Sequence, residues 1–511
     1  MSDPAYSATP SADSVARGGA WRLAASLAPQ GYVFAVSVVA ARVLGPADMG
    51  RQSFISFVVG TTTLLLTGGL AASLMRHVAE LVGKGDRSAI SSLVSWVGRR
   101  QLVAAFVAAA LVGVTGALQG ELRTAWTFAA AGAALGVLHS VPNSVMVGFQ
   151  RWRQHSLSAL AMGAVGAAAT IAVLLVGGGI EGMFAVEAGV AVAGLVVMTF
   201  LALRAVPGLR LAGAGPPEPD LQRRTRTYAR GALLQLVLHV IVWRRTELFV
   251  LERTASPAAL AHYSIAFSLL MVLGRVPIAL TSTLSPAFAT LKGAGEHERI
   301  ASGFARAVRL LLLASLPITA AVLATGPRLL VTVYGTEYQP AGTALLVMAG
   351  VFPLVALHQT GVSVLQGIGQ VRPLVMAGAA ATVVDLALAI GLIPTYGATG
   401  AAIANAVAQA TAAALTFSFA RRAIGEVHLD GRALAGLAAS SAVAGVAAWF
   451  AVHAAGGVSG LALAALAGTA TFLVASRVIG VIAPTDVEWL QGALRGRAGR
   501  AVAGVARQLS S

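Results

Sequence analysis

The sequence contains no cysteine, which excludes disulfides, thiolate metal sites and cysteine nucleophiles. Charge is also scarce, because only 11% of the residues are Asp, Glu, Lys or Arg, whereas a soluble domain carries about a quarter. Apolar residues make up 57% of the chain, and the mean hydropathy is +0.78. A chain this apolar needs lipid around most of its length, so an ordinary globular enzyme is excluded.

The motifs of common enzymes are missing as well. There is no H-E-x-x-H zinc motif, no Walker glycine-lysine loop, no G-x-S-x-G and no G-x-G-x-x-G after a strand. Without a phosphate-binding loop the chain cannot use ATP by itself, and its predicted outer loops are too short for the catalytic domain of a membrane glycosyltransferase or polymerase. We expect no enzymatic activity and no cofactor, and any work must come from an ion gradient, the membrane potential or the substrate's own gradient.

What the sequence does have is long, continuous apolar runs, and a helix crosses a bilayer with about 20 such residues. A membrane β-barrel would instead show short alternating segments. The runs predict an all-α polytopic membrane protein with fourteen spans, at residues 23–44, 53–77, 90–117, 125–147, 156–176, 183–203, 228–250, 259–290, 304–325, 341–365, 372–393, 399–420, 433–453 and 459–482.

The positions of the basic residues predict the orientation of these spans. With the N-terminus inside, 28 of the 36 Lys and Arg fall in cytoplasmic segments, five in outer loops and three within spans. Cytoplasmic loops of membrane proteins are enriched in Lys and Arg. We therefore expect a multi-pass protein of the plasma (inner) membrane with both termini in the cytoplasm. The net charge of +16 is then an orientation signal, and we expect no nucleic-acid partner.

The two halves of the chain repeat one another. Three pairs of loop motifs match in order at offsets of 211, 219 and 218 residues: Pro46–Ser53 with Pro257–Ser264, Gly148–Arg153 with Gly367–Arg372, and Gly179–Gly182 with Gly397–Gly400. Parallel repeats are typical of transporters, whose substrate path lies between the repeats. The repeat predicts two six-helix lobes with two extra helices.

The predicted domains follow from these spans and repeats. The tail carries a capping-box sequence and arginines interleaved with Trp and Leu, so we expect it to lie on the anionic inner leaflet. The segments are a cytoplasmic segment at 1–22, an N-lobe at 23–204, an inter-lobe loop at 205–227, a C-lobe at 228–421, spans thirteen and fourteen at 432–482, and a basic amphipathic tail at 484–511.

Ionisable residues at membrane depth are costly and are therefore functional candidates. Arg275 stands near the middle of the eighth apolar run, two residues before Pro277, where the helix should kink. It is the strongest single candidate for binding substrate. The alternative is a structural pair with an acid such as Asp385 or Glu247.

Span seven holds four further candidates, His239, Arg244, Arg245 and Glu247. Arg244 and Glu247 can pair at i and i+3, which leaves Arg245 needing another acid, a wet cavity, an anionic ligand or the outer headgroups.

Acids in other spans are candidates for coupling to an ion. Asp385 in span eleven and Glu187 in span six would be proton or cation sites or, alternatively, polar locks between helices. Arg42, in the tight turn before Gly45 and Pro46, can face the mouth of a cavity.

Several stretches resemble one family of transporters. They are Ala41–Gly50, Leu74–Glu80, Thr254–Tyr263, Val333–Tyr338 and Ile393–Ala404. Together they resemble the polysaccharide (O-antigen and exopolysaccharide) flippase family of the multidrug/oligosaccharidyl-lipid/polysaccharide exporter superfamily. The resemblance runs from span one to span twelve.

This resemblance implies two six-helix bundles facing each other in a V around a central cavity, which carries a lipid-linked glycan to the outer leaflet by alternating access. In related lipid II flippases, cations on spans one, two and eight receive the pyrophosphate. Their Leu-Arg-Arg pattern on span two corresponds here to Met75-Arg76-His77, so Arg76 matches and His77 replaces the second arginine. Arg275 matches the span-eight cation. Span one offers only Arg22, at its inner end.

The expected function is the flipping of a polyprenyl-pyrophosphate-linked oligosaccharide or cell-envelope polysaccharide precursor. The implied partners are this glycan lipid, anionic membrane lipids and polysaccharide polymerases or glycosyltransferases. Two alternatives stay open: a cation-coupled multidrug antiporter, and a scaffold of a polysaccharide-assembly complex that transports nothing.

Overall fold

The computed structural model describes the backbone of residues 12–206, 208–209, 213–243, 247–273, 284–427 and 429–481, and most side chains from residue 30 onward. All regular structure in these ranges is helical, which confirms the all-α prediction.

The first helices are α1 (Ala12–Lys84), α2 (Arg87–Gln119), α3 (Arg123–Gly148), α4 (Trp152–Leu175), α5 (Gly179–Ala205) and α6 (Pro219–Trp243). They are followed by α7 (Glu247–Thr254), α8 (Pro257–Leu273), α10 (Leu284–Gly293), α11 (His297–Tyr334), the short 3-10 helix η1 (Thr336–Tyr338), α12 (Ala341–Gly367), α13 (Arg372–Ile424), α14 (Gly431–Ala454) and α15 (Gly457–Ile479).

Ten of the described helices are long and apolar enough to cross a membrane. Two of them, α1 and α13, each contain two predicted spans, because the chain turns inside the helix at a single glycine. Gly45 has φ 73° and Gly397 has φ 51°, a backbone conformation that glycine adopts without steric cost. The predicted turns between spans one and two and between spans eleven and twelve are thereby confirmed.

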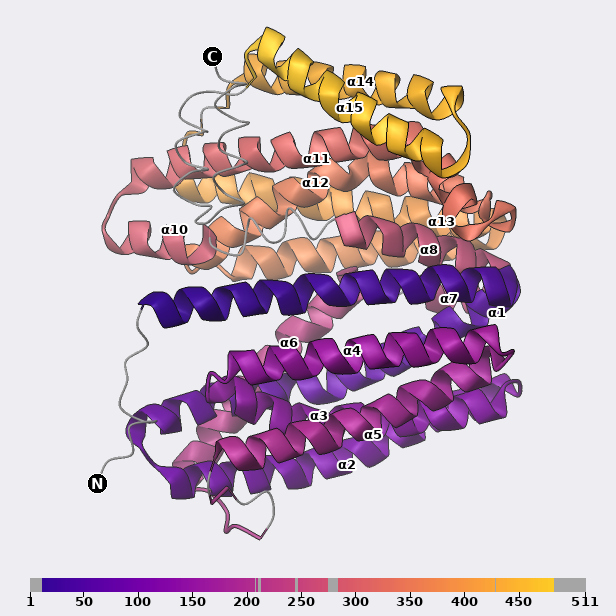
Figure 1. The fold of residues 1–511 in the computed structure, drawn as a ribbon. Coiled ribbons are helices and arrows are strands. Elements are labelled where there is room, and N and C mark those ends of the chain that lie inside the picture. Colours follow the sequence, from indigo (N-terminus) through magenta and orange to yellow (C-terminus); the bar gives the residue numbers. More distant parts are fainter. Residues whose placement is uncertain are drawn as a thin grey trace. The chain divides into compact units, whose positions relative to one another are not determined.

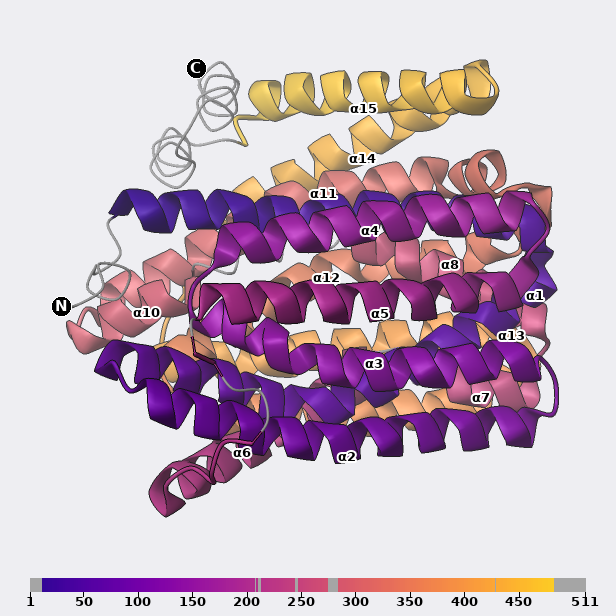
Figure 2. The same ribbon diagram turned by 60° about the horizontal axis from the view of Figure 1, so that its bottom comes forward.

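By their contacts the residues form two compact units, unit 1 (Met1–Arg244) and unit 2 (Arg245–Ser511). In unit 1, α3 packs between α2 and α5, and α4 packs on α5 and α1 (Figures 1 and 2). Glycines allow these close approaches. A Cβ on Gly116 would lie 2.4 Å from Trp126, and one on Gly148 would lie 2.8 Å from Val78.

In unit 2, α12 packs between α11 and α13, and α14 and α15 form a hairpin against α11 (Figure 1). Two arginines of α11 fix this hairpin. Arg309 donates a hydrogen bond to the carbonyl of Val481 and Arg328 donates one to the carbonyl of Val452. The two extra C-terminal helices are therefore anchored to unit 2 near both of their ends.

The lobe boundaries remain predictions, but the contacts add one fact about span seven. Its first part, α6, packs along α1 and belongs to unit 1, whereas the sequence places the whole span in the C-lobe. The predicted basic tail, residues 484–511, lies outside the described residues.

Candidate functional site

Helix α6 runs antiparallel along the second half of α1. Two glycines of α1 make the approach close: a Cβ on Gly69 would lie 2.6 Å from the carbonyl oxygen of Ala229, and one on Gly68 would lie 2.1 Å from a methyl carbon of Leu236. Nearer the start of α6, the hydroxyl of Ser73 donates a hydrogen bond to the carbonyl of Thr225 at 2.9 Å. The residues of α1 that follow Ser73 therefore face the first turns of α6.

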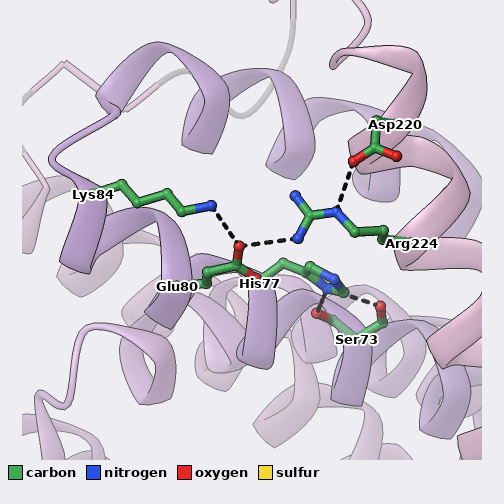
Figure 3. Close-up of polar contacts among 6 residues, drawn as sticks. All are labelled: Ser73, His77, Glu80, Lys84, Asp220 and Arg224. Carbon is green, nitrogen blue, oxygen red and sulfur yellow. Dashed lines mark hydrogen bonds and ion pairs between the residues drawn. The ribbon is translucent and has the colours of Figure 1, made fainter.

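His77 is buried at this helix pair, with 4% of its surface exposed. Its Nδ1 lies 2.8 Å from the carbonyl oxygen of Ser73 (Figure 3). Because a carbonyl oxygen only accepts, Nδ1–H is the donor of this hydrogen bond. The edge of the imidazole ring meets Tyr228, with the ring centroids 6.2 Å apart. His77 is therefore part of the packing between α1 and α6, and the prediction that it binds substrate remains a prediction.

Arg76, the neighbour of His77, is exposed. Its guanidinium carbon lies 4.6 Å from the centroid of the Tyr228 ring, a cation–π contact. No ion pair of Arg76 is found among the described residues. The ring holds one face of the guanidinium and leaves its N–H groups available to an anion.

Charged side chains at the end of α1 and the start of α6 pair with one another (Figure 3). Glu80 Oε1 accepts hydrogen bonds from Lys84 at 2.7 Å and from Arg224 at 3.0 Å. Arg224 Nε also lies 3.0 Å from Asp220, and Arg223 donates to Asp220 at 2.9 Å. The hydrogen bond from Arg223 and the charges of both arginines lower the pKa of Asp220 below its ordinary value of 3.8. This ion-pair network ties the start of α6 to the end of α1.

A second polar group lies in unit 2. Glu247, at the start of α7, is 1% exposed, and its Oε1 accepts a hydrogen bond from Asn405 at 2.7 Å. Asn405 in turn accepts one from Gln409, one turn further along α13, at 2.5 Å. An amide chain of this kind fixes the orientation of the carboxylate.

Asp385 and Tyr263 also interact with the Glu247 carboxylate, and both are 1% exposed or less. We call Glu247, Asp385, Asn405 and Tyr263 the acid cluster. Two carboxylates this deeply buried need a shared proton, or a cation between them. The predicted role of Glu247 and Asp385 in ion coupling remains a prediction, and their burial side by side favours it.

Glu187 has a different environment in unit 1. It lies on the face of α5 that carries the buried Met183, Phe184 and Met198, yet its own side chain is exposed. The exposed apolar residues of α5, such as Val196 and Phe200, occupy the opposite face. Glu187 therefore lies on the core-facing side of α5, and its role as an ion site remains a prediction.

The remaining predicted site residues are placed only in part. Arg42 is exposed at the end of span one. Arg22 and His239 lie in α1 and α6, but the structure describes only their backbone. Arg244, Arg245 and Arg275 lie outside the described residues. The structure thus brings together Glu247 and Asp385, and it places the neighbours Arg76 and His77 against the same ring, that of Tyr228.

Sequence reasoning missed three uncharged residues of these groups, Tyr228, Tyr263 and Asn405. A signal existed for Asn405, because it is one of two amides, with Gln409, in a run of apolar residues within a predicted span, where polar side chains bond between helices. Tyr228 and Tyr263 gave no signal, since aromatic residues are ordinary in membrane helices.

Two family models match the chain. A model described as polysaccharide biosynthesis protein matches residues 15–292, more than half of the chain. The chain belongs to the polysaccharide biosynthesis protein family. A second model, MatE, matches residues 236–390. No curated protein matches the sequence.

Solved structures agree with this family at the level of the fold. The structure resembles the lipid II flippase MurJ in an inward closed conformation, with a TM-score of 0.71, 11% identity, and 89% of this chain and 97% of that chain covered. It also resembles an inward-facing multidrug resistance MATE family transporter of the MOP superfamily, with a TM-score of 0.69, 13% identity, and 79% and 98% covered. A MOP superfamily transporter from Pyrococcus furiosus matches with a TM-score of 0.50, 14% identity, and 78% and 96% covered. This member of the polysaccharide biosynthesis family is thus a multi-pass membrane protein with a MOP-superfamily transporter fold, and its relatives are transporters and flippases, not enzymes.

Proposed function

We propose that this protein flips a polyprenyl-pyrophosphate-linked oligosaccharide, or a related cell-envelope polysaccharide precursor, from the inner to the outer leaflet of the plasma membrane by alternating access. Both termini face the cytoplasm, as the basic residues predict. The observation that carries the proposal is Arg76, which is exposed and held by an aromatic ring in a family that serves polysaccharide biosynthesis.

The chemistry of the substrate supports an arginine in this place. A pyrophosphate that leaves the headgroup region needs compensating charge, and the planar guanidinium stays ionised and binds phosphate with two parallel hydrogen bonds. Because Glu80 already pairs with Lys84 and Arg224, it does not compete with the substrate for Arg76. The other proposed contacts of the pyrophosphate are Arg275, Arg22, Arg42, Arg244, Arg245 and His77.

We further propose that the acid cluster couples transport to a proton or a monovalent cation. This coupling would supply the work, since the sequence has no ATP-binding loop. Glu187 and His239 are additional candidates for the same role. An anionic membrane lipid surface and enzymes of polysaccharide assembly are the proposed partners.

The test is transport of a fluorescent disaccharide-pyrophosphate polyprenyl lipid by the purified protein in liposomes. Lipid that remains in the inner leaflet is protected from an external reductant. We expect Arg76→Ala to slow the exchange between leaflets by about tenfold, Arg76→Lys to slow it less, and Arg76→Ala with Arg275→Ala to abolish it. The matched control is Arg153→Ala, which removes another exposed arginine of unit 1.

Full exchange by the double variant would contradict the proposed function. The same assay separates the alternatives. A scaffold would show no exchange even in the wild type. The buried acid cluster favours the cation-coupled antiporter as the second candidate, and cation-driven drug efflux that is lost in Asp385→Asn, without any movement of the glycan lipid, would support it.

A further inference from the structure

Three arginines of unit 1 lie close together beside one tryptophan, and none of them is in an ion pair among the residues that the structure describes. The guanidinium carbon of Arg100 lies 3.5 Å from the centroid of the Trp96 ring, and that of Arg226 lies 5.5 Å from it. Arg99 and Arg226 are both close enough to repel the charge of Arg100. We call Arg99, Arg100 and Arg226 the arginine cluster; α2 provides the first two and α6 provides the third.

The arginine cluster is fixed in position. Trp96 is 3% exposed and belongs to the hydrophobic core at this end of unit 1. Arg100 lies over its ring and donates a hydrogen bond from Nη1 to the Trp96 carbonyl at 3.1 Å. Both contacts hold the guanidinium in one orientation, so little conformational entropy is lost when an anion binds.

The positive charge of the cluster is not compensated within the described part of the chain. The ion pairs found there involve Arg223 and Arg224 on α6 but not Arg226, and none involves Arg99 or Arg100. Arg99 and Arg226 are exposed. The repulsion between three like charges held together in this way is relieved by an anion that all three can reach.

The position of the cluster along α2 identifies the source of that anion. Directly beyond Arg100 begins an exposed apolar stripe, which contains Leu102, Val103, Phe106, Val107, Leu111, Val114 and Leu118. Arg99 continues the same stripe, because it precedes Leu102 and Val103 by about one turn of α2. A basic group at the end of a lipid-facing stripe lies at the level of the phospholipid headgroups.

We propose that the arginine cluster binds the phosphate of an anionic phospholipid, whose acyl chains lie along the Leu102–Leu118 stripe of α2. Arg100 and Arg226 hold the phosphate from the two helices, and Arg99 faces the headgroup from the lipid side. A soluble phosphate ester would gain the charge contacts but not the apolar contacts. The site is therefore one for a membrane lipid, and it is independent of the transported substrate.

The test compares lipid binding by the purified full chain in a neutral detergent. Fluorescent phosphatidylglycerol and phosphatidylcholine with the same acyl chains are titrated into the wild type, into Arg100→Gln with Arg226→Gln, and into Arg421→Gln with Arg422→Gln. The last variant is the matched control, because it removes two exposed arginines at the end of α13. We expect phosphatidylglycerol to bind the cluster variant on the order of tenfold more weakly than the wild type, and the control unchanged.

A photoreactive phosphatidylglycerol gives a second measurement on the unaltered protein. We expect its adducts on residues 96–106 of α2 and on the start of α6. Equal weakening in both double variants would show a response to net charge and would overturn the site, as would adducts confined to other segments. Displacement by glycerol phosphate would reassign the site to soluble phosphates, and selective displacement by a polyprenyl diphosphate would reassign it to the transported lipid.

Discussion

Arg76 and Arg224 lie at the same end of unit 1, yet their surroundings give them different roles. Two carboxylates hold Arg224, whereas Arg76 rests on the Tyr228 ring. The sequence predicts which charges lie near the membrane but not how they pair, because Glu80 and Arg224 are 144 residues apart. The same holds for Asn405 and Glu247, which are 158 residues apart. The sequence therefore predicts which charged and polar residues lie near the membrane, but it does not predict which side chains pair with one another.

At this scale we predict that Glu247→Gln uncouples transport from its driving ion. Glutamine keeps the shape and the hydrogen bond with Asn405 but cannot neutralise a cation. Exchange of the lipid-linked substrate without a gradient should persist, and its acceleration by an imposed proton or sodium gradient should fall by about tenfold.

Asp385→Asn should behave in the same way, and Glu426→Gln, an exposed acid after α13, should keep full acceleration. Unchanged acceleration in both acid-cluster variants would rule out this role for the cluster.

The packing of α6 on α1 is set by single glycines among many. The chain has 57 glycines, so the sequence alone does not distinguish those that touch a neighbouring helix from those that face open space. The long apolar runs predicted the helices well, since length and hydropathy decide whether a segment crosses a membrane. They could not show that α6 packs with unit 1, because helix packing depends on which small residues face which neighbour.

Gly69→Ala should weaken this helix pair, because the new methyl group would lie 2.6 Å from the Ala229 carbonyl oxygen. We expect a destabilisation of about 1–3 kcal/mol, measured as a lower midpoint of thermal unfolding in detergent. Gly60→Ala is the matched control on the same helix, with open space at its Cβ.

Alanine favours a helix over glycine, so the control should be neutral or more stable than the wild type. Equal stability of the two variants would contradict the close approach of α6 to α1.

Over the whole molecule, the sequence predicted the all-α membrane fold and its superfamily, and both are confirmed. It did so because the apolar runs and the loop motifs that carry these predictions recur along most of the chain. The orientation in the membrane is inferred from the distribution of many basic residues, each of which contributes little by itself, and it remains a prediction.

Labelling of single cysteines tests this orientation without background, because the natural chain has no cysteine. Gly83→Cys and Ala294→Cys should be protected from an impermeant maleimide in intact cells. Thr124→Cys and Gln339→Cys should react; all four positions are exposed. If Gly83→Cys and Ala294→Cys reacted and the other two variants were protected, the protein would have the opposite orientation in the membrane, which would contradict the proposed direction of transport.

The exposed apolar stripe of α2 also bears on the surrounding bilayer. It extends over Leu102–Leu118, about 24 Å at 1.5 Å per residue. The exposed apolar residues of α15 extend over Val458–Val474, also about 24 Å, before the exposed Arg477 interrupts them. Both stripes are shorter than an average hydrocarbon core of about 30 Å, and a mismatch of this kind costs fractions of a kcal/mol per Å. We therefore expect the acyl-chain length of the surrounding lipids to be a variable of the protein's activity.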